Sequence, residues 1–77
     1  MWTMEQAKRD FQFGFLDSFH IERVNDGVND VWRVRLRGGS ASGVLVDARE
    51  KKPRLFKSLD SAVSAVEQIG FKVDSLH

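Results

Sequence analysis

The sequence contains no cysteine, a single proline, Pro53, and two histidines, His20 and His77. Without cysteine the chain can form neither disulfides nor thiolate zinc sites, and this composition suits a reducing cytoplasm, where we expect the protein. Two histidines, one of them at the C-terminus, cannot assemble an acid–base pair or a metal cluster with the usual ligand spacing. We therefore expect no metal, no cofactor and no enzymatic activity, and interpret His20 as a surface residue of a strand.

Long apolar runs and a nucleotide loop are also missing. No run approaches the roughly 20 apolar residues of a membrane span. The N-terminal segment carries Glu5 and Asp10 where a signal peptide would be apolar, so we expect no membrane partner. The glycine-rich segment GGSASG at 38–43 lacks the lysine and the following helix of a phosphate-binding loop, which argues against a nucleotide site.

The chain is short, and its charge is unevenly distributed. Its 77 residues, 42% hydrophobic and 30% charged, predict one folded domain spanning 1–77. The net charge is +1, but residues 1–30 carry −3, residues 31–57 carry +6 and residues 58–77 carry −2. The middle third of the chain is therefore a basic block.

The first part of the chain predicts a helix followed by a strand. Thr3 can cap a helix N-terminus with Gln6 completing a capping box, and apolar residues at helical spacing carry the helix to about Leu16. Residues 18–24 alternate apolar and polar side chains, which predicts a strand whose inner face carries Phe19 and Ile21. The segment NDGVND at 25–30 is then a turn.

The segment VWRVRLRGG at 31–39 alternates apolar and basic residues almost without exception. In a strand Trp32, Val34 and Leu36 lie on one face and the three arginines on the other. We expect GGSASG to be a turn, a third strand to open at 44–46, and Leu55 and Phe56 to return the chain to the core after a polar excursion.

The C-terminal part predicts a second helix. Ser58 is its N-cap, Asp60 lies in its first turn, and Gly70 ends it in a left-handed cap. Its apolar face comprises Leu59, Ala62, Val63, Val66 and Ile69. Residues 71–73 can add a short final strand. The predicted fold is α+β, with element order α-β-β-β-α, a three-stranded antiparallel sheet and both helices on one face. The predicted core comprises Phe11, Phe15, Trp32, Val34, Leu36, Val63 and Val66.

The arginines are the main candidate for a binding surface. Three guanidinium groups about 7 Å apart along one strand can meet phosphates or guanine edges in a DNA major groove. The candidate duplex DNA contacts are Arg33, Arg35, Arg37, Lys51, Lys52, Arg54 and Lys57. An equally good interpretation is a solvated face on which Glu22 and Asp47 neutralise the arginines across the sheet, and an acidic protein partner is a third.

The first predicted helix is apolar on a second side, through Trp2, Phe13 and Leu16. A contiguous exposed apolar patch usually marks an interaction surface, which predicts a protein partner or a homodimer. The alternative is that Leu76 or the final strand folds back over the patch. Both alternatives bury Phe13.

The segments WRVRL and LFKSLDSAVSAVEQIG resemble, over about residues 19–70, the sheet-then-helix pattern of plant ethylene-response-type DNA-binding domains and of the arm-binding domains of phage integrases. That resemblance implies a sheet that contacts the major groove and a helix that supports it. The segment VDAREKKPRLFKSLDSAVSAVEQIGF is similar to small, in part partition-associated proteins of bacterial plasmids and integrative elements, which implies an accessory protein of a mobile element.

Overall fold

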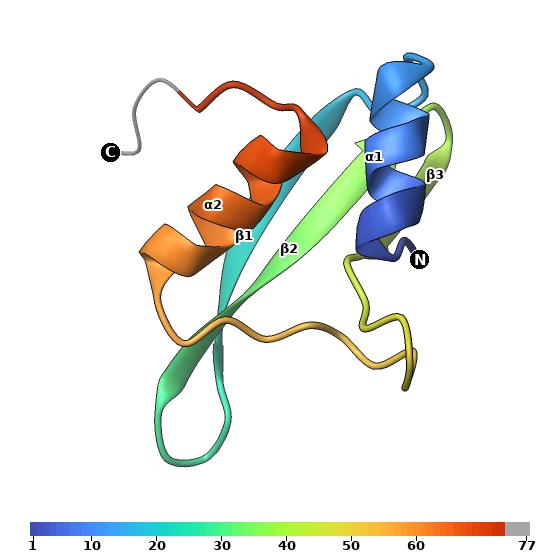
Figure 1. The fold of residues 1–77 in the computed structure, drawn as a ribbon. Helices are drawn as coiled ribbons and strands as arrows, with labels where there is room; N and C mark the ends of the chain where they lie inside the picture. Colours follow the sequence, from blue (N-terminus) through green and yellow to red (C-terminus); the bar gives the residue numbers. More distant parts are fainter. Residues whose placement is uncertain (74–77) are drawn as a thin grey trace.

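The computed structural model describes residues 1–73 and shows a small α+β fold, as the sequence predicted (Figure 1). Two helices flank three strands in the predicted order α-β-β-β-α. The elements are α1 (Met4–Gln12), β1 (Ser18–Asn25), β2 (Asp30–Gly38), β3 (Ala41–Val44) and α2 (Leu59–Ile69). Residues 71–73 form no strand, and the remainder of the predicted final strand, with Leu76, lies outside the described residues.

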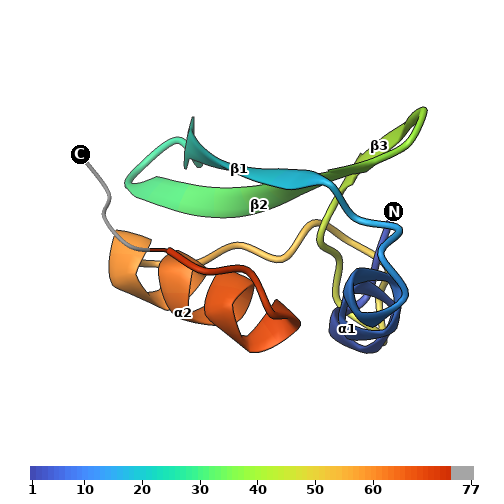
Figure 2. The same ribbon diagram turned by 90° about the horizontal axis from the view of Figure 1, so that it is seen from above.

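The sheet is antiparallel with β2 at its centre. β1 pairs with β2 along its whole length, from Ser18 opposite Arg37 to Asn25 opposite Asp30. β3 covers only one end of the other edge of β2, and Phe56 pairs with Trp32 farther along that edge. Figure 2 shows both helices on one side of the sheet, so its opposite face is not covered by any element of residues 1–73.

The core lies between the sheet and the two helices. Val34 and Leu36 of β2 are fully buried there, and Trp32 is half-buried against the same cluster, which confirms the predicted inward face of β2. The buried cluster comprises Trp2, Ala7, Leu16, Val34, Leu36, Leu45, Phe56, Ala62, Ala65, Val66 and Ile69. Burial of such apolar area is the main favourable term in folding.

Helix α1 begins as predicted but ends at Gln12, four residues before the predicted end at Leu16. The Thr3 side chain accepts a hydrogen bond from the Gln6 amide, and the Gln6 side chain accepts one from the Thr3 amide, which forms the capping box. Gly14 then adopts φ +79°, a left-handed conformation that terminates the helix. Phe15 therefore lies outside the helical stripe and is 63% exposed. The prediction that Phe15 belongs to the core was wrong.

The segment GGSASG is mostly strand rather than turn. Only Gly39 and Ser40 form the turn, because Gly38 already pairs with Ala41 across the hairpin. Gly39 has φ +60° at the first turn position, where a two-residue type II′ hairpin favours glycine. β3 therefore begins at Ala41, three residues earlier than expected.

Helix α2 follows the sequence pattern closely. The Ser58 hydroxyl accepts from the Ser61 amide at 3.1 Å, and Gly70 ends the helix with φ +133°. Ala62, Val66 and Ile69 are buried as predicted, and Ala65 joins them although the sequence analysis did not select it. The prediction that Leu55 and Leu59 point into the core was wrong, because their side chains are 51% and 39% exposed. Both lie at or before the first turn of α2, where the chain is still approaching the core.

Candidate nucleic-acid interface

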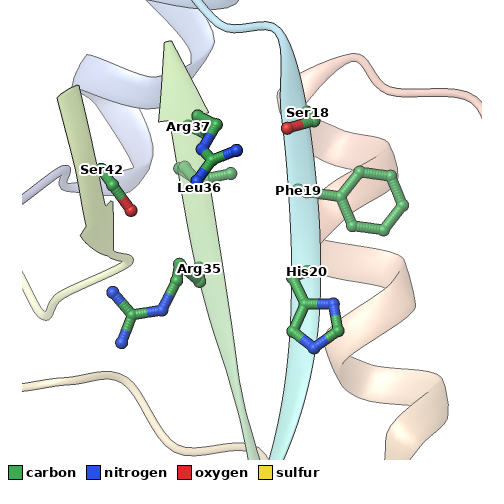
Figure 3. A pocket seen from close by; sticks show the side chains of 7 residues that line it. All are labelled: Ser18, Phe19, His20, Arg35, Leu36, Arg37 and Ser42. Atoms are coloured by element: carbon green, nitrogen blue, oxygen red, sulfur yellow. The ribbon is translucent and has the colours of Figure 1, made fainter. Parts of the chain in front are cut away.

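The three arginines of β2 lie on the face of the sheet opposite the core. Arg33, Arg35 and Arg37 alternate with the inward residues Val34 and Leu36, so the pleat directs them away from the helices. We call this surface the open face. The alternation predicted from the sequence is therefore confirmed, and Figure 3 shows the side chains of Arg35 and Arg37 on it.

One carboxylate bridges two of the arginines. Glu22 of β1 lies directly opposite Arg33, and its two oxygens accept hydrogen bonds from the Nε atoms of Arg33 at 2.6 Å and of Arg35 at 3.1 Å. These hydrogen bonds, first that of Arg33 and then that of Arg35, hold the pKa of Glu22 below its ordinary value. Arg37 makes no ion pair among residues 1–73. The open face is thus partly neutralised and keeps an excess of positive charge.

Asp47 does not take part in this neutralisation, contrary to the prediction. It follows the β3 hairpin in a separate loop, where its carboxylate accepts from the backbone amides of Arg49 at 2.6 Å and Glu50 at 3.3 Å. Those two backbone hydrogen bonds lower the pKa of Asp47. The third strand had been expected to place Asp47 on the outer face, but the chain turns after Asp47 instead.

The Glu22 bridge makes a pH-dependent contribution to stability. Because the folded state lowers the pKa of Glu22 from about 4.5, the contribution is present above that pH and is lost as the pH falls through the lowered value. For partly exposed pairs we expect at most about 1 kcal/mol at pH 7. Urea unfolding should show Glu22→Gln less stable than the wild type by this amount at pH 7.

The difference between the two proteins should shrink as the pH falls below about 4.5, because Glu22 of the unfolded chain then becomes protonated, and it should vanish once the folded carboxyl is protonated below its lowered pKa. A stability difference that stays constant to strongly acidic pH would show that the carboxylate charge is not the stabilising feature. Glu67→Gln is a suitable control, since Glu67 is exposed on α2 on the helix side of the sheet and makes no ion pair among residues 1–73.

The basic loop, residues 49–54, does not join the open face. Figure 2 shows the segment between β3 and α2 on the helix side of the sheet. Lys51 lines a surface depression together with Glu5 and Arg9 of α1. The remaining candidates lie along the same segment: Lys52 is exposed, Arg54 lies over the Phe56 ring at 5.2 Å, and Lys57 immediately precedes the cap of α2. The structure thus separates Lys51, Lys52 and Arg54 from the three arginines, whereas Lys57 lies at the edge of the sheet beside Asp30 and Val31 of β2.

The predicted apolar patch on the first helix is also not present. Trp2 and Leu16 are only 9% and 6% exposed, because both side chains belong to the core. Trp2 is held there by its backbone pairing with Leu45 beside β3. The Trp2 indole N–H donates to Asp10 at 2.9 Å. Phe13 is 63% exposed, so the expectation that it is buried was wrong for the part of the chain that the structure describes. Its ring lies 6.0 Å from that of Phe15.

The polar residues that surround the arginines were not predicted from the sequence. Ser18 lies opposite Arg37 on β1, Ser42 lies opposite Arg37 on β3, and His20 lies opposite Arg35. Figure 3 shows these side chains around one shallow concavity of the open face. Strand alternation placed His20 outward, but only the register of the three strands brings these residues together.

Other kinds of site are not formed by the described residues. Residues 1–73 contain no group of three or more histidine or acidic side chains arranged to hold a metal ion. Within the same range, neither helix has the length and apolar character needed to cross a membrane. Comparisons with protein-family models, with curated proteins and with solved structures find no match for the chain. Its function has to be inferred from its own residues.

Proposed function

We propose that this protein is a non-enzymatic binding module that contacts duplex DNA through the open face. The observation that carries the proposal is the arrangement of Arg33, Arg35 and Arg37 on an uncovered sheet face with a single carboxylate, Glu22, among them. DNA binding is largely driven by neutralisation of backbone phosphates by lysine and arginine. The role in a mobile element is proposed from the sequence resemblance alone.

The geometry suits a duplex. Side chains two residues apart along a strand are separated by about 7 Å, and a major groove about 12 Å wide admits a two-stranded ribbon. Glu22 engages Arg33 and Arg35 through Nε, which leaves the terminal nitrogens of both guanidinium groups available to an acceptor. Single-stranded DNA is a poorer fit, because Phe19 and Trp32 point to the helix side and offer no stacking surface.

The test is the salt dependence of binding to a fluorescently labelled duplex. If two or three arginines contact phosphates, the logarithm of the association constant should fall with the logarithm of salt concentration with a slope of about −2 to −3. Glu22→Gln removes the only carboxylate that pairs with these arginines among residues 1–73, and it should tighten binding several-fold. A labelled duplex that shows no binding at low salt would contradict the proposal.

Protein association through Phe13 and Phe15 has weaker support. Each side chain is 63% exposed and the rings are 6.0 Å apart. A stable interface buries roughly 800 Å² per partner, whereas a fully buried phenylalanine contributes about 150–250 Å². Two partly exposed rings therefore supply too little area for a stable dimer by themselves, and the DNA proposal is the better supported one.

A further inference from the structure

The open face contains a defined concavity at one end of the sheet. It spans all three strands and has a volume of about 350 Å³. This volume lies at the lower end of the range of roughly 300–1,000 Å³ that is found for small-ligand sites. The concavity therefore suits a small chemical group rather than a cofactor. The residues that line it are Ser18, Phe19, His20, Arg35, Leu36, Arg37 and Ser42.

The polar lining of the concavity consists of hydrogen-bond donors brought together by strand register. Ser18, Arg37 and Ser42 form one row across the three strands, and His20 and Arg35 form the next row. Side chains opposite each other in such rows have Cβ atoms about 4.5–5.5 Å apart, so a single small ligand can reach several of them. In Figure 3 the Arg37 guanidinium lies over β2 between Ser18 and Ser42, the Arg35 guanidinium lies on the β3 side of β2 and the His20 ring lies on the β1 side.

The chemistry of this lining favours an oxyanion. It combines two guanidinium groups, an imidazole and two hydroxyls, and it includes no carboxylate. The nearest acidic side chains are already engaged: Glu22 accepts from Arg33 and Arg35, and Asp17 accepts from the Gly39 amide at 2.9 Å. The Glu22 contact holds Arg35 by its Nε, while Arg37 is exposed and makes no ion pair among residues 1–73. Guanidinium groups bind phosphate oxygens in a bidentate manner.

We infer that this concavity is a binding site for one phosphate group, held by Arg35, Arg37 and His20 with the hydroxyls of Ser18 and Ser42. The assignment of that phosphate to the backbone of duplex DNA rests on the proposed function. Bound there, a single phosphate would fix the register of the sheet along the duplex, because phosphate contacts position a protein without reading the sequence. Arg33 lies outside the lining, and the terminal nitrogens that its hydrogen bond to Glu22 leaves unused are available for a separate contact.

The experiment is a titration of the uniformly ¹⁵N-labelled protein with inorganic phosphate, followed by amide NMR, with sodium chloride at matched ionic strength as the reference. We expect phosphate-specific shifts to cluster at residues that line the concavity. The Ser18→Ala/Ser42→Ala variant removes two hydroxyls without changing the charge, and it should weaken phosphate binding about five- to tenfold. Ser61→Ala/Ser64→Ala is the matched control, because these two serines are exposed on α2 and lie outside the lining, and it should leave the phosphate affinity unchanged.

The same variants, tested on a labelled duplex, separate the two proposals. Weaker duplex binding by Ser18→Ala/Ser42→Ala supports a backbone phosphate in the concavity. Duplex binding that is unaffected by this variant, with no phosphate-specific shifts, overturns the inference and leaves the DNA proposal standing. Phosphate binding in the concavity without any duplex affinity overturns the DNA proposal and retains the phosphate site. Shifts that spread equally to the basic loop at 49–52 would also overturn the inference.

Discussion

Replacement of Arg33, Arg35 and Arg37 together by alanine is expected to weaken duplex binding at least about 100-fold. Each lost phosphate contact is worth about 1 kcal/mol on an exposed face, and 1.4 kcal/mol corresponds to a factor of ten. The variant should remain folded, because these side chains lie opposite the core and their ion pairs with Glu22 contribute little to stability. Fluorescence anisotropy at low salt measures the affinity, and far-UV circular dichroism verifies the fold.

The basic loop provides a charge-matched control for this experiment. Arg49→Ala, Lys51→Gly and Lys52→Ala also remove three positive charges, but from the helix side of the sheet. Glycine is chosen at Lys51 because this residue has φ +60°, which alanine would adopt with strain. We expect the control variant to lose at most a few-fold in affinity. An equal loss in both variants would mean that overall charge, rather than the open face, determines binding.

Gly38→Ala is expected to destabilise the sheet strongly. A Cβ atom at this position would overlap the backbone carbonyl group of Phe15, and backbone cannot rotate away as a flexible side chain can. The segment after α1 is fixed here by the Asp17 amide, which donates to the Arg37 carbonyl at 2.7 Å. Overpacking of this kind costs about 3 kcal/mol. For a domain of this size that corresponds to a fall in Tm of roughly 12–24 °C, measured by thermal unfolding.

The neighbouring glycine provides the comparison. A Cβ atom at Gly39 would meet no atom within 4 Å, and its φ of +60° is one that asparagine tolerates. Gly39→Asn should therefore cost less than about 1 kcal/mol. If Gly38→Ala unfolds at the same temperature as Gly39→Asn, the segment that carries Phe15 does not approach the sheet as closely as described.

The parts of the fold that the sequence predicted correctly depend on local patterns. The two-residue alternation of β2 separates Val34 and Leu36 from the arginines whatever the rest of the chain does. Ser58 and Gly70 likewise mark the ends of α2 through hydrogen bonds formed within a few residues of each. The open face and its arginines were therefore predictable, as was the helix that supports the opposite side.

The errors arose where a residue's position depends on a distant partner. Trp2 is buried because it pairs with Leu45, more than forty residues away, and no local pattern indicates this contact. The side of the sheet on which the basic loop lies is set in part by Phe56, which pairs with Trp32. The bridge from Glu22 to Arg33 was predictable once β1 and β2 were paired, whereas the small residues of GGSASG concealed the strand that places Ser42 beside Arg37.

The placement of both helices on one side of the sheet has a practical consequence for protein engineering. Alternate positions of each strand differ in function, since one set packs against the helices while residues such as Ser18, Arg37 and Ser42 lie on the uncovered face. The outward set can be randomised in a display library while the packed set is kept constant. A library built at Ser18, His20, Arg35, Arg37 and Ser42 would change the specificity of this small scaffold without altering the residues that fold it.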